Sequence, residues 1–198
     1  MVRHGLRQLL DRDPDINVLG EAANGNEVFE MLRSHKADVI VLDISMPGRN
    51  GLETLKELRK LYPEIPVIML SMHPSDQYAV RVLRAGAASY LTKESAPDEL
   101  AIAIRRAYSG QQYITAEVGL VLANYVGRGI GDEPHKALSD REFEVFCLIG
   151  GGNGLTQIAN RMSLSVKTIS TYRARIIEKT GLANNAEITR YAILHGLV

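Results

Sequence analysis

The 198-residue sequence has a single cysteine, Cys147, and no apolar run long enough to cross a membrane. One cysteine excludes an internal disulfide, and the apolar helical pattern around Cys147 predicts a core residue and not a catalytic thiol. The 5 histidines show neither the spacing nor the cysteine company of a zinc site. Because the N-terminus also lacks the apolar region of a secretory signal, we expect a cytoplasmic protein without a membrane segment.

The sequence also lacks an excess of either positive or negative charge. The chain has 23 Lys and Arg against 23 Asp and Glu, so its formal net charge is +0. Residues 138–198 nevertheless hold a small excess of basic residues, which permits DNA binding without requiring it. Most of these basic residues cluster in one predicted helix, residues 166–180, and this clustering matters more than the total.

Predicted strands and helices alternate over the first 110 residues. The predicted helices cover residues 3–12, 25–34, 51–61, 76–85 and 97–109, and the predicted strands cover residues 16–22, 38–43, 66–71 and 89–92. This alternation predicts an α/β domain with a doubly wound parallel sheet. In such sheets the functional groups gather beyond the carboxyl ends of the strands, where Asp43, Ser71 and Lys93 fall.

Three segments that follow these strands, LDISMPGRNGLE, LSMH and YLTKE, resemble the receiver domain of two-component response regulators. The resemblance implies that Asp43 accepts a phosphoryl group from a sensor histidine kinase. It also implies that Ser71 hydrogen-bonds the phosphate, that Lys93 pairs with it and that Tyr90 is the switching aromatic. The residue types suit this chemistry, although each alone could be a cap, a turn former or a solvated charge.

One part of the receiver pattern is missing from the sequence. The family's receiver starts with a strand that ends in two acidic residues, which bind Mg²⁺, whereas residues 1–10 match the helix that follows that strand. In the flavodoxin-like order 2-1-3-4-5 this strand is central, so its neighbours would lose a pairing partner. Asp43 alone should hold Mg²⁺ weakly, and we expect little phosphorylation. Either the receiver is degenerate, or the sequence starts at an internal methionine of a longer reading frame.

The alternation ends after residue 110. A helix at 115–126 and a Gly- and Pro-containing linker at 127–137 are expected to connect two domains, so that residues 1–110 form the receiver, 111–137 the connector and 138–198 a second domain. The segment GGGNG lacks the Lys and Ser or Thr of a phosphate-binding loop, and we interpret it as a helix stop and turn.

Four helices are predicted in the second domain, at residues 140–149, 156–162, 166–180 and 185–195. Ser139 and Glu142 form a capping box for the first of them, and Ser165 caps the third. The third helix has one apolar face and one polar, basic face with short side chains. Such a face can enter a major groove, although it could also be an ordinary solvated surface.

The segments LSDREFEV, LTQIANRMSLSVKTISTYRARIIEKTGL and NNAEITRYAI resemble the helix-turn-helix domain of LuxR-type regulators. Together with the receiver, they make the chain similar to a NarL/FixJ-like response regulator. The resemblance implies that the last helix carries a dimer contact. It further implies that the third helix presents Ser170, Thr171 and Ala174 to bases and holds phosphates with Lys167, Thr168, Arg175 and Lys179.

Arg173 does not fit this scheme, because it falls on the inward sector of the third helix, where an unpaired charge is costly. We expect its partner to be Glu142 or, as second choice, Glu144. The sequence thus predicts a receiver-like α/β domain followed by an all-α DNA-binding domain. We expect a sequence-specific transcriptional regulator that binds duplex DNA as a homodimer and is not an enzyme. The alternative is an interaction module that forms mixed dimers with related regulators and withholds them from DNA.

Overall fold

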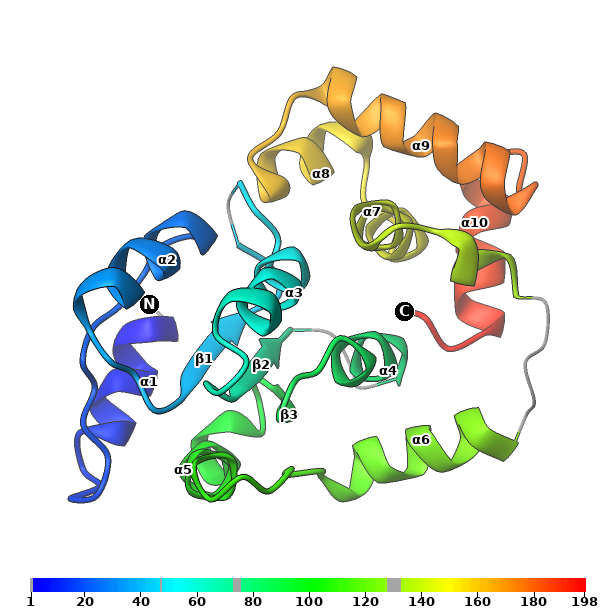
Figure 1. Cartoon of the computed structure of the whole chain (residues 1–198). Coiled ribbons are helices and arrows are strands. Elements are labelled where there is room, and N and C mark those ends of the chain that lie inside the picture. The colour runs from blue at the N-terminus through cyan, green and yellow to red at the C-terminus, as the bar shows by residue number, and fades with distance from the viewer. Residues whose placement is uncertain (1, 47, 73–75, 128–132) are drawn as a thin grey trace. The chain divides into compact units, whose positions relative to one another are not determined.

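The structure, a computed structural model, describes residues 2–46, 48–72, 76–127 and 133–198 (Figure 1). The chain divides into two compact units, Met1–Ala123 and Asn124–Val198. Residues 128–132 of the predicted linker lie outside the described residues. None of the described helices is both long enough and apolar enough to cross a membrane.

The N-terminal unit contains a parallel sheet in the order β1 (Ile40–Asp43), β2 (Val67–Ser71) and β3 (Ser89–Thr92). Ile40 pairs with Val67, and Ile68 pairs with Ser89. The helices of this unit are α1 (Val2–Leu10), α2 (Gly25–Ser34), α3 (Gly51–Leu61), α4 (Asp76–Arg84) and α5 (Ala96–Tyr108), followed by α6 (Ala116–Gly127). The predicted α/β class with a parallel sheet is therefore confirmed.

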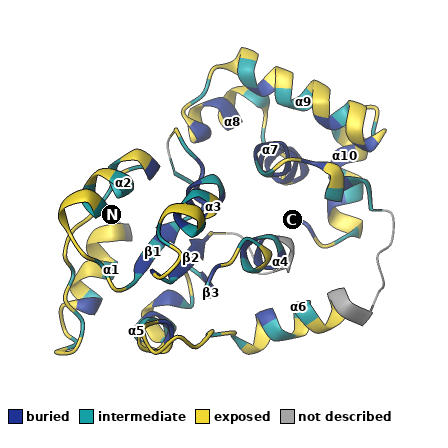
Figure 2. Cartoon of the chain, in the orientation of Figure 1, coloured by how far each residue is buried: buried dark blue, intermediate teal, exposed yellow. Residues whose placement is uncertain are grey.

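Both faces of the sheet are covered by helices. Ile68 and Leu70 of β2 pack with Leu10 of α1 and Leu100 of α5. Because side chains alternate along a strand, Val67 and Met69 point to the opposite face, and there α3 and α4 lie against the sheet (Figure 1). All of β2 is buried (Figure 2). This covering explains why the strand sequences are almost continuously apolar.

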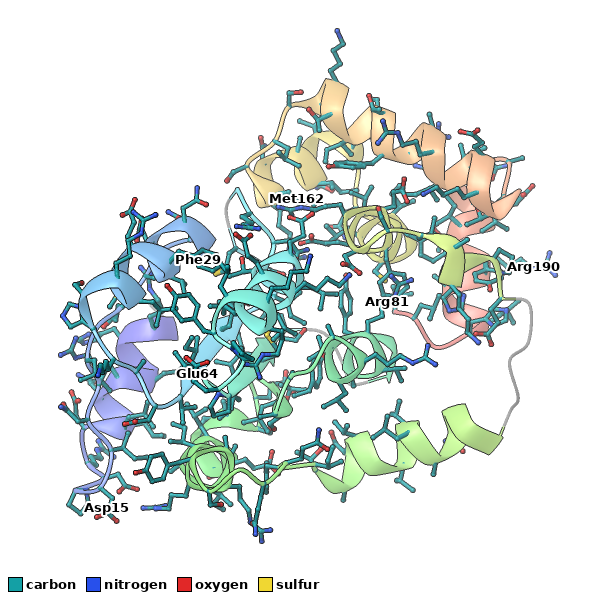
Figure 3. All side chains as sticks on the ribbon, in the orientation of Figure 1. Asp15, Phe29, Glu64, Arg81, Met162 and Arg190 are labelled. Atoms are coloured by element: carbon teal, nitrogen blue, oxygen red, sulfur yellow. The ribbon has the colours of Figure 1, made fainter. Side chains whose placement is uncertain are left out.

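The strand predicted at residues 16–22 is wrong. This segment runs as irregular chain between α1 and α2, and its Ile16 and Val18 pack against the α1–α5 side of the core. A strand forms only beside a partner, and in the described part of the chain β1 pairs with β2 alone. Arg105 of α5 binds Asp13 beyond the end of α1, close to Asp15, which lies at the turn (Figure 3). Apolar side chains and this ion pair anchor the segment in place of a sheet ladder.

The C-terminal unit is helical, as predicted. It contains a short 3₁₀ helix, η1 (Pro134–Ala137), and then α7 (Asp140–Gly150), α8 (Leu155–Met162), α9 (Val166–Thr180) and α10 (Asn185–Leu194). Its core is formed mainly by fully buried aromatic and aliphatic side chains, including Phe143, Phe146, Ile158, Ile169, Ile176 and Ile188. Met162 at the end of α8 is buried in the same unit (Figure 3). Cys147 is buried too, which confirms it as a core residue.

The local signals at the helix ends match the sequence prediction. Ser139 and Glu142 form the expected capping box, and Ser165 accepts a hydrogen bond from the Thr168 N–H. The segment 150–154 ends α7 and turns the chain, with Gly152 at φ 82°, where a side chain would be strained. The helix-stop interpretation of this glycine-rich segment is therefore confirmed.

Candidate phosphoryl-acceptor site and nucleic-acid interface

Asp43 ends β1 at the carboxyl edge of the sheet, and both of its oxygens are engaged. Oδ1 accepts a hydrogen bond from the Ser45 N–H at 3.0 Å, and Oδ2 accepts one from Nζ of Lys93. The Lys93 side chain is 14% exposed and that of Asp43 is 29% exposed, so the ion pair is partly shielded from water. The structure thus brings together two residues that lie 50 positions apart in the sequence.

Gly51 fixes the backbone around Asp43. Its N–H donates to the carbonyl oxygen of Ile44 at 3.0 Å, and a Cβ added at Gly51 would collide with the carbonyl oxygen of Asp43. The side chain of Asn50 accepts the Leu52 N–H at 2.7 Å and caps α3. The first turn of α3 therefore packs directly on the end of β1. Sequence reasoning did not find this support, although the pair Asn-Gly before a predicted helix was a visible signal.

Ser71 and Tyr90 lie on β2 and β3, the other two strands of the sheet. Ser71 is buried at the end of β2, and its carbonyl oxygen accepts the backbone N–H of Lys93 at 2.8 Å. Tyr90 lies in β3 opposite Met69 in the register and is fully buried. Asp43, Ser71 and Lys93 therefore gather at one edge of the sheet, as their positions at strand ends predicted.

The described residues at this edge do not supply the set of ligands that a magnesium ion requires. Within the described ranges, no three or more His, Cys, Asp or Glu side chains are close enough together to hold one metal ion. Mg²⁺ requires near-octahedral oxygen ligands, whereas Asp43 offers one carboxylate that is already paired with an ammonium group.

The second candidate surface is the outward face of α9. Ile169 and Ile176 are buried on its inner side. Most residues predicted to contact DNA are exposed, namely Lys167, Ser170, Thr171, Ala174, Arg175 and Lys179, while Thr168 is half-buried. The hydroxyl of Thr171 donates to the carbonyl oxygen of Lys167 at 3.0 Å. Only residues 163–165 separate α8 from α9, which is the connection of a helix-turn-helix.

The predicted partner of Arg173 is wrong. Its Nε donates to Oδ1 of Asn185, the first residue of α10, at 2.6 Å. Arg173 is only half-buried, so it needs no carboxylate to balance its charge. Both expected partners have other donors, because Glu144 binds Arg141 at 3.0 Å and Glu142 binds Lys179. The sequence did hold a signal for this partner in the adjacent pair Asn184 and Asn185 at the start of a predicted helix. Asn184 caps that helix, which leaves the side chain of Asn185 to accept a hydrogen bond from Arg173.

Lys179, one of the predicted phosphate contacts, contacts a carboxylate of its own unit. Its Nζ lies 2.6 Å from Oε2 of Glu142, which also accepts the Ser139 N–H at 2.8 Å. Burial by itself would raise the pKa of Glu142. The hydrogen bonds from Lys179 and Ser139 outweigh burial and lower that pKa below its ordinary value. The carboxylate is therefore held in its charged form.

Together these two surfaces define a class of protein, one in which a receiver-like α/β unit is joined to a helix-turn-helix unit. Residues 1–105 match the family model of the response regulator receiver domain, and residues 136–192 match that of the bacterial regulatory proteins of the luxR family. The chain belongs to the LuxR-type two-component response regulators, which are DNA-binding transcription factors.

Individual relatives agree with this assignment along the whole chain. The response regulator UvrY of Escherichia coli K12 is 35% identical over 198 residues, which cover 100% of this chain and 91% of that protein. Among solved structures, RcsB from Salmonella enterica serovar Typhimurium bound to the promoter rprA with phosphomimetic BeF3− has a TM-score of 0.63 and 27% identity, and covers 95% of this chain and 91% of that one. A structure of two RcsB dimers bound to two parallel DNAs has a TM-score of 0.58 and 26% identity, and covers 100% of this chain and 94% of that one.

Proposed function

We propose that this chain recognises specific duplex DNA through the outward face of α9 and does so as a homodimer. The observation that carries this proposal is a capped helix with buried isoleucines on one side and exposed short, polar and basic side chains on the other. In this assignment Ser170, Thr171 and Ala174 face bases, while Lys167, Thr168 and Arg175 hold phosphates. The RcsB dimers bound to DNA support the homodimer. The proposal places the dimer contact on α10.

The receiver-like unit is proposed to regulate this binding. Asp43 is the proposed phosphoryl acceptor for a sensor histidine kinase, with Ser71, Tyr90 and Lys93 as the residues that respond. We expect phosphorylation of Asp43 to be slow, because its single carboxylate, already paired with Lys93, cannot replace a site of several carboxylates. The proposed organisation remains receiver 1–110, connector 111–137 and DNA-binding domain 138–198. The proposed place of action is the cytoplasm, and the proposal includes no enzymatic turnover.

A binding experiment tests the recognition face. A duplex is selected from a random pool by the full chain, and affinity is then measured for that duplex and for random duplexes at several salt concentrations. Lys167→Ala should weaken both, with the salt slope reduced by about 1, whereas Thr171→Ala should change the preferred base by about 1–3 kcal/mol. Equal effects of both variants on selected and random DNA would contradict the assignment.

The mixed-dimer alternative is not favoured, because the chain keeps a complete and capped α9 within the matched LuxR-type segment. The same experiment separates the two functions. A chain that binds no duplex under any salt condition, yet binds a related regulator, would support the alternative.

A further inference from the structure

Glu142 of α7 forms an ion pair with Lys179 of α9. It lies in the first turn of α7, where its Oε2 accepts the Ser139 N–H at 2.8 Å and its own N–H donates to the Ser139 hydroxyl at 3.4 Å. The same carboxylate oxygen accepts Nζ of Lys179, in the last turn of α9, at 2.6 Å. Glu142 is 3% exposed, so this charge is almost removed from water.

The Lys179–Glu142 contact differs in kind from the apolar contacts of α9. Ile169 and Ile176 hold α9 in the core, but apolar contact is non-directional and does not by itself set the position of a helix along its axis. The Lys179–Glu142 contact joins residues 37 positions apart and is directional. With the bond from Arg173 to Asn185 it gives α9 two polar attachments, one to α7 and one to α10.

The environment of the pair argues against a phosphate contact for Lys179. To reach a phosphate, the ammonium group would leave Glu142, and a carboxylate that is 3% exposed would remain without its cation. Removing the cation from so deeply buried a carboxylate is costly for this reason. The lowered pKa of Glu142 is consistent with a carboxylate that stays charged because Lys179 and Ser139 bind it.

We infer that Glu142 and Lys179 are positioning residues for DNA reading: the pair sets where α9 presents its outer face, and neither side chain contacts DNA. This inference rests on the proposed function, because it assumes that α9 reads DNA. It separates Lys179 from Lys167 and Arg175, which remain the proposed phosphate contacts.

The experiment uses the full chain and the duplex selected by it. Glu142→Gln keeps the capping box, because the Gln oxygen can still accept the Ser139 N–H, but it removes the charge that binds Lys179. Lys179→Met removes the other partner. Each variant should lower the ratio of selected to random affinity by about tenfold, and the double variant should lower it no further, because both break one interaction. The salt slope should stay unchanged in all three variants.

Three control variants show whether an effect is specific to the Lys179–Glu142 pair. Glu178→Gln removes the same charge from the exposed side of α9 and should leave the ratio unchanged. Lys179→Arg keeps a donor for Glu142 and should restore the ratio. Lys167→Met shows what the loss of a phosphate contact looks like, with a salt slope reduced by about 1. Lys179 has a 39% exposed side chain, so its variants test the inference even if Glu142→Gln does not fold.

Two results would overturn the inference. One is a Lys179→Met variant that weakens selected and random DNA alike with a reduced salt slope, since that is the behaviour of a phosphate contact. The other is Glu142→Gln that folds and keeps the full affinity ratio. Failure of the proposed function is distinct, because in that case the unmodified chain itself selects no duplex.

Discussion

Replacing Gly51 with alanine should destabilise the N-terminal unit, whereas the same replacement at Gly5 should stabilise it. A Cβ at position 51 would overlap the carbonyl oxygen of Asp43 and would lie 2.9 Å from Cα of Ile44, and both neighbours are backbone atoms that cannot rotate away. A Cβ at position 5, within α1, meets nothing within 4 Å. The two variants add the same methyl group to two helices of one unit.

The expected magnitudes follow from these surroundings. Alanine in an open helical position is better than glycine by about 0.5–1 kcal/mol, so Gly5→Ala should raise the free energy of unfolding by that amount. At Gly51 the first turn of α3 must move away from β1, and such overpacking costs about 1–3 kcal/mol. The change should also disturb the loop that holds Asp43 beside Lys93.

Denaturant unfolding followed with probes in each unit measures both effects, because two units need not unfold in one transition. Only the transition of the N-terminal unit should shift, downward for Gly51→Ala and upward for Gly5→Ala. If Gly51→Ala left this transition unchanged or raised it, the packing of α3 against the end of β1 would be wrong.

Three further predictions concern the rest of the chain. Because the pKa of Glu142 is lowered on folding, its stabilisation is complete above its unfolded pKa of ~4.3 and is lost as pH falls through the lower folded value. Glu142→Gln should therefore be less stable at neutral pH and match the unmodified chain in acid; a difference independent of pH would count against this. The isolated fragment 138–198 should unfold cooperatively in calorimetry. A fragment 133–198 should be more stable by ~2–4 kcal/mol, because it adds His135, which is fully buried and hydrogen-bonds Tyr191. Equal stability of the two fragments would refute a role for η1. Asp43 should take up little phosphoryl group from a small-molecule donor with Mg²⁺, and rapid labelling that Asp43→Asn abolishes would refute this.

Local signals were enough to predict most elements from the sequence. The helices at 51–61 and 166–180 were placed with the observed bounds, and the capping box at Ser139 was found. Each of these depends on residues within a few positions of one another. The predicted strand at 16–22 failed for the opposite reason, since a strand depends on a partner that local alternation does not reveal.

Long-range polar partners were harder to predict than elements. Strand ends predicted that Asp43 and Lys93 meet, because a parallel sheet brings its carboxyl ends to one edge. No comparable rule relates the ends of helices in a small bundle, so Arg173 was assigned to a carboxylate instead of Asn185. The choice depended on how deeply Arg173 is buried, which the helical wheel overestimated.

In each unit, apolar burial and charged contacts have different roles. Apolar burial supplies most of the free energy of folding, but it is proportional to area and specifies direction poorly. Direction comes from charged side chains at the ends of elements, from Lys93 to Asp43 in one unit and from Lys179 to Glu142 in the other. The first contact lies at the carboxyl edge of the sheet, where Asp43 is the proposed phosphoryl acceptor, and the second lies in α9, which is proposed to read DNA. Substituting one member should therefore change how that surface is presented more than it changes whether the unit folds.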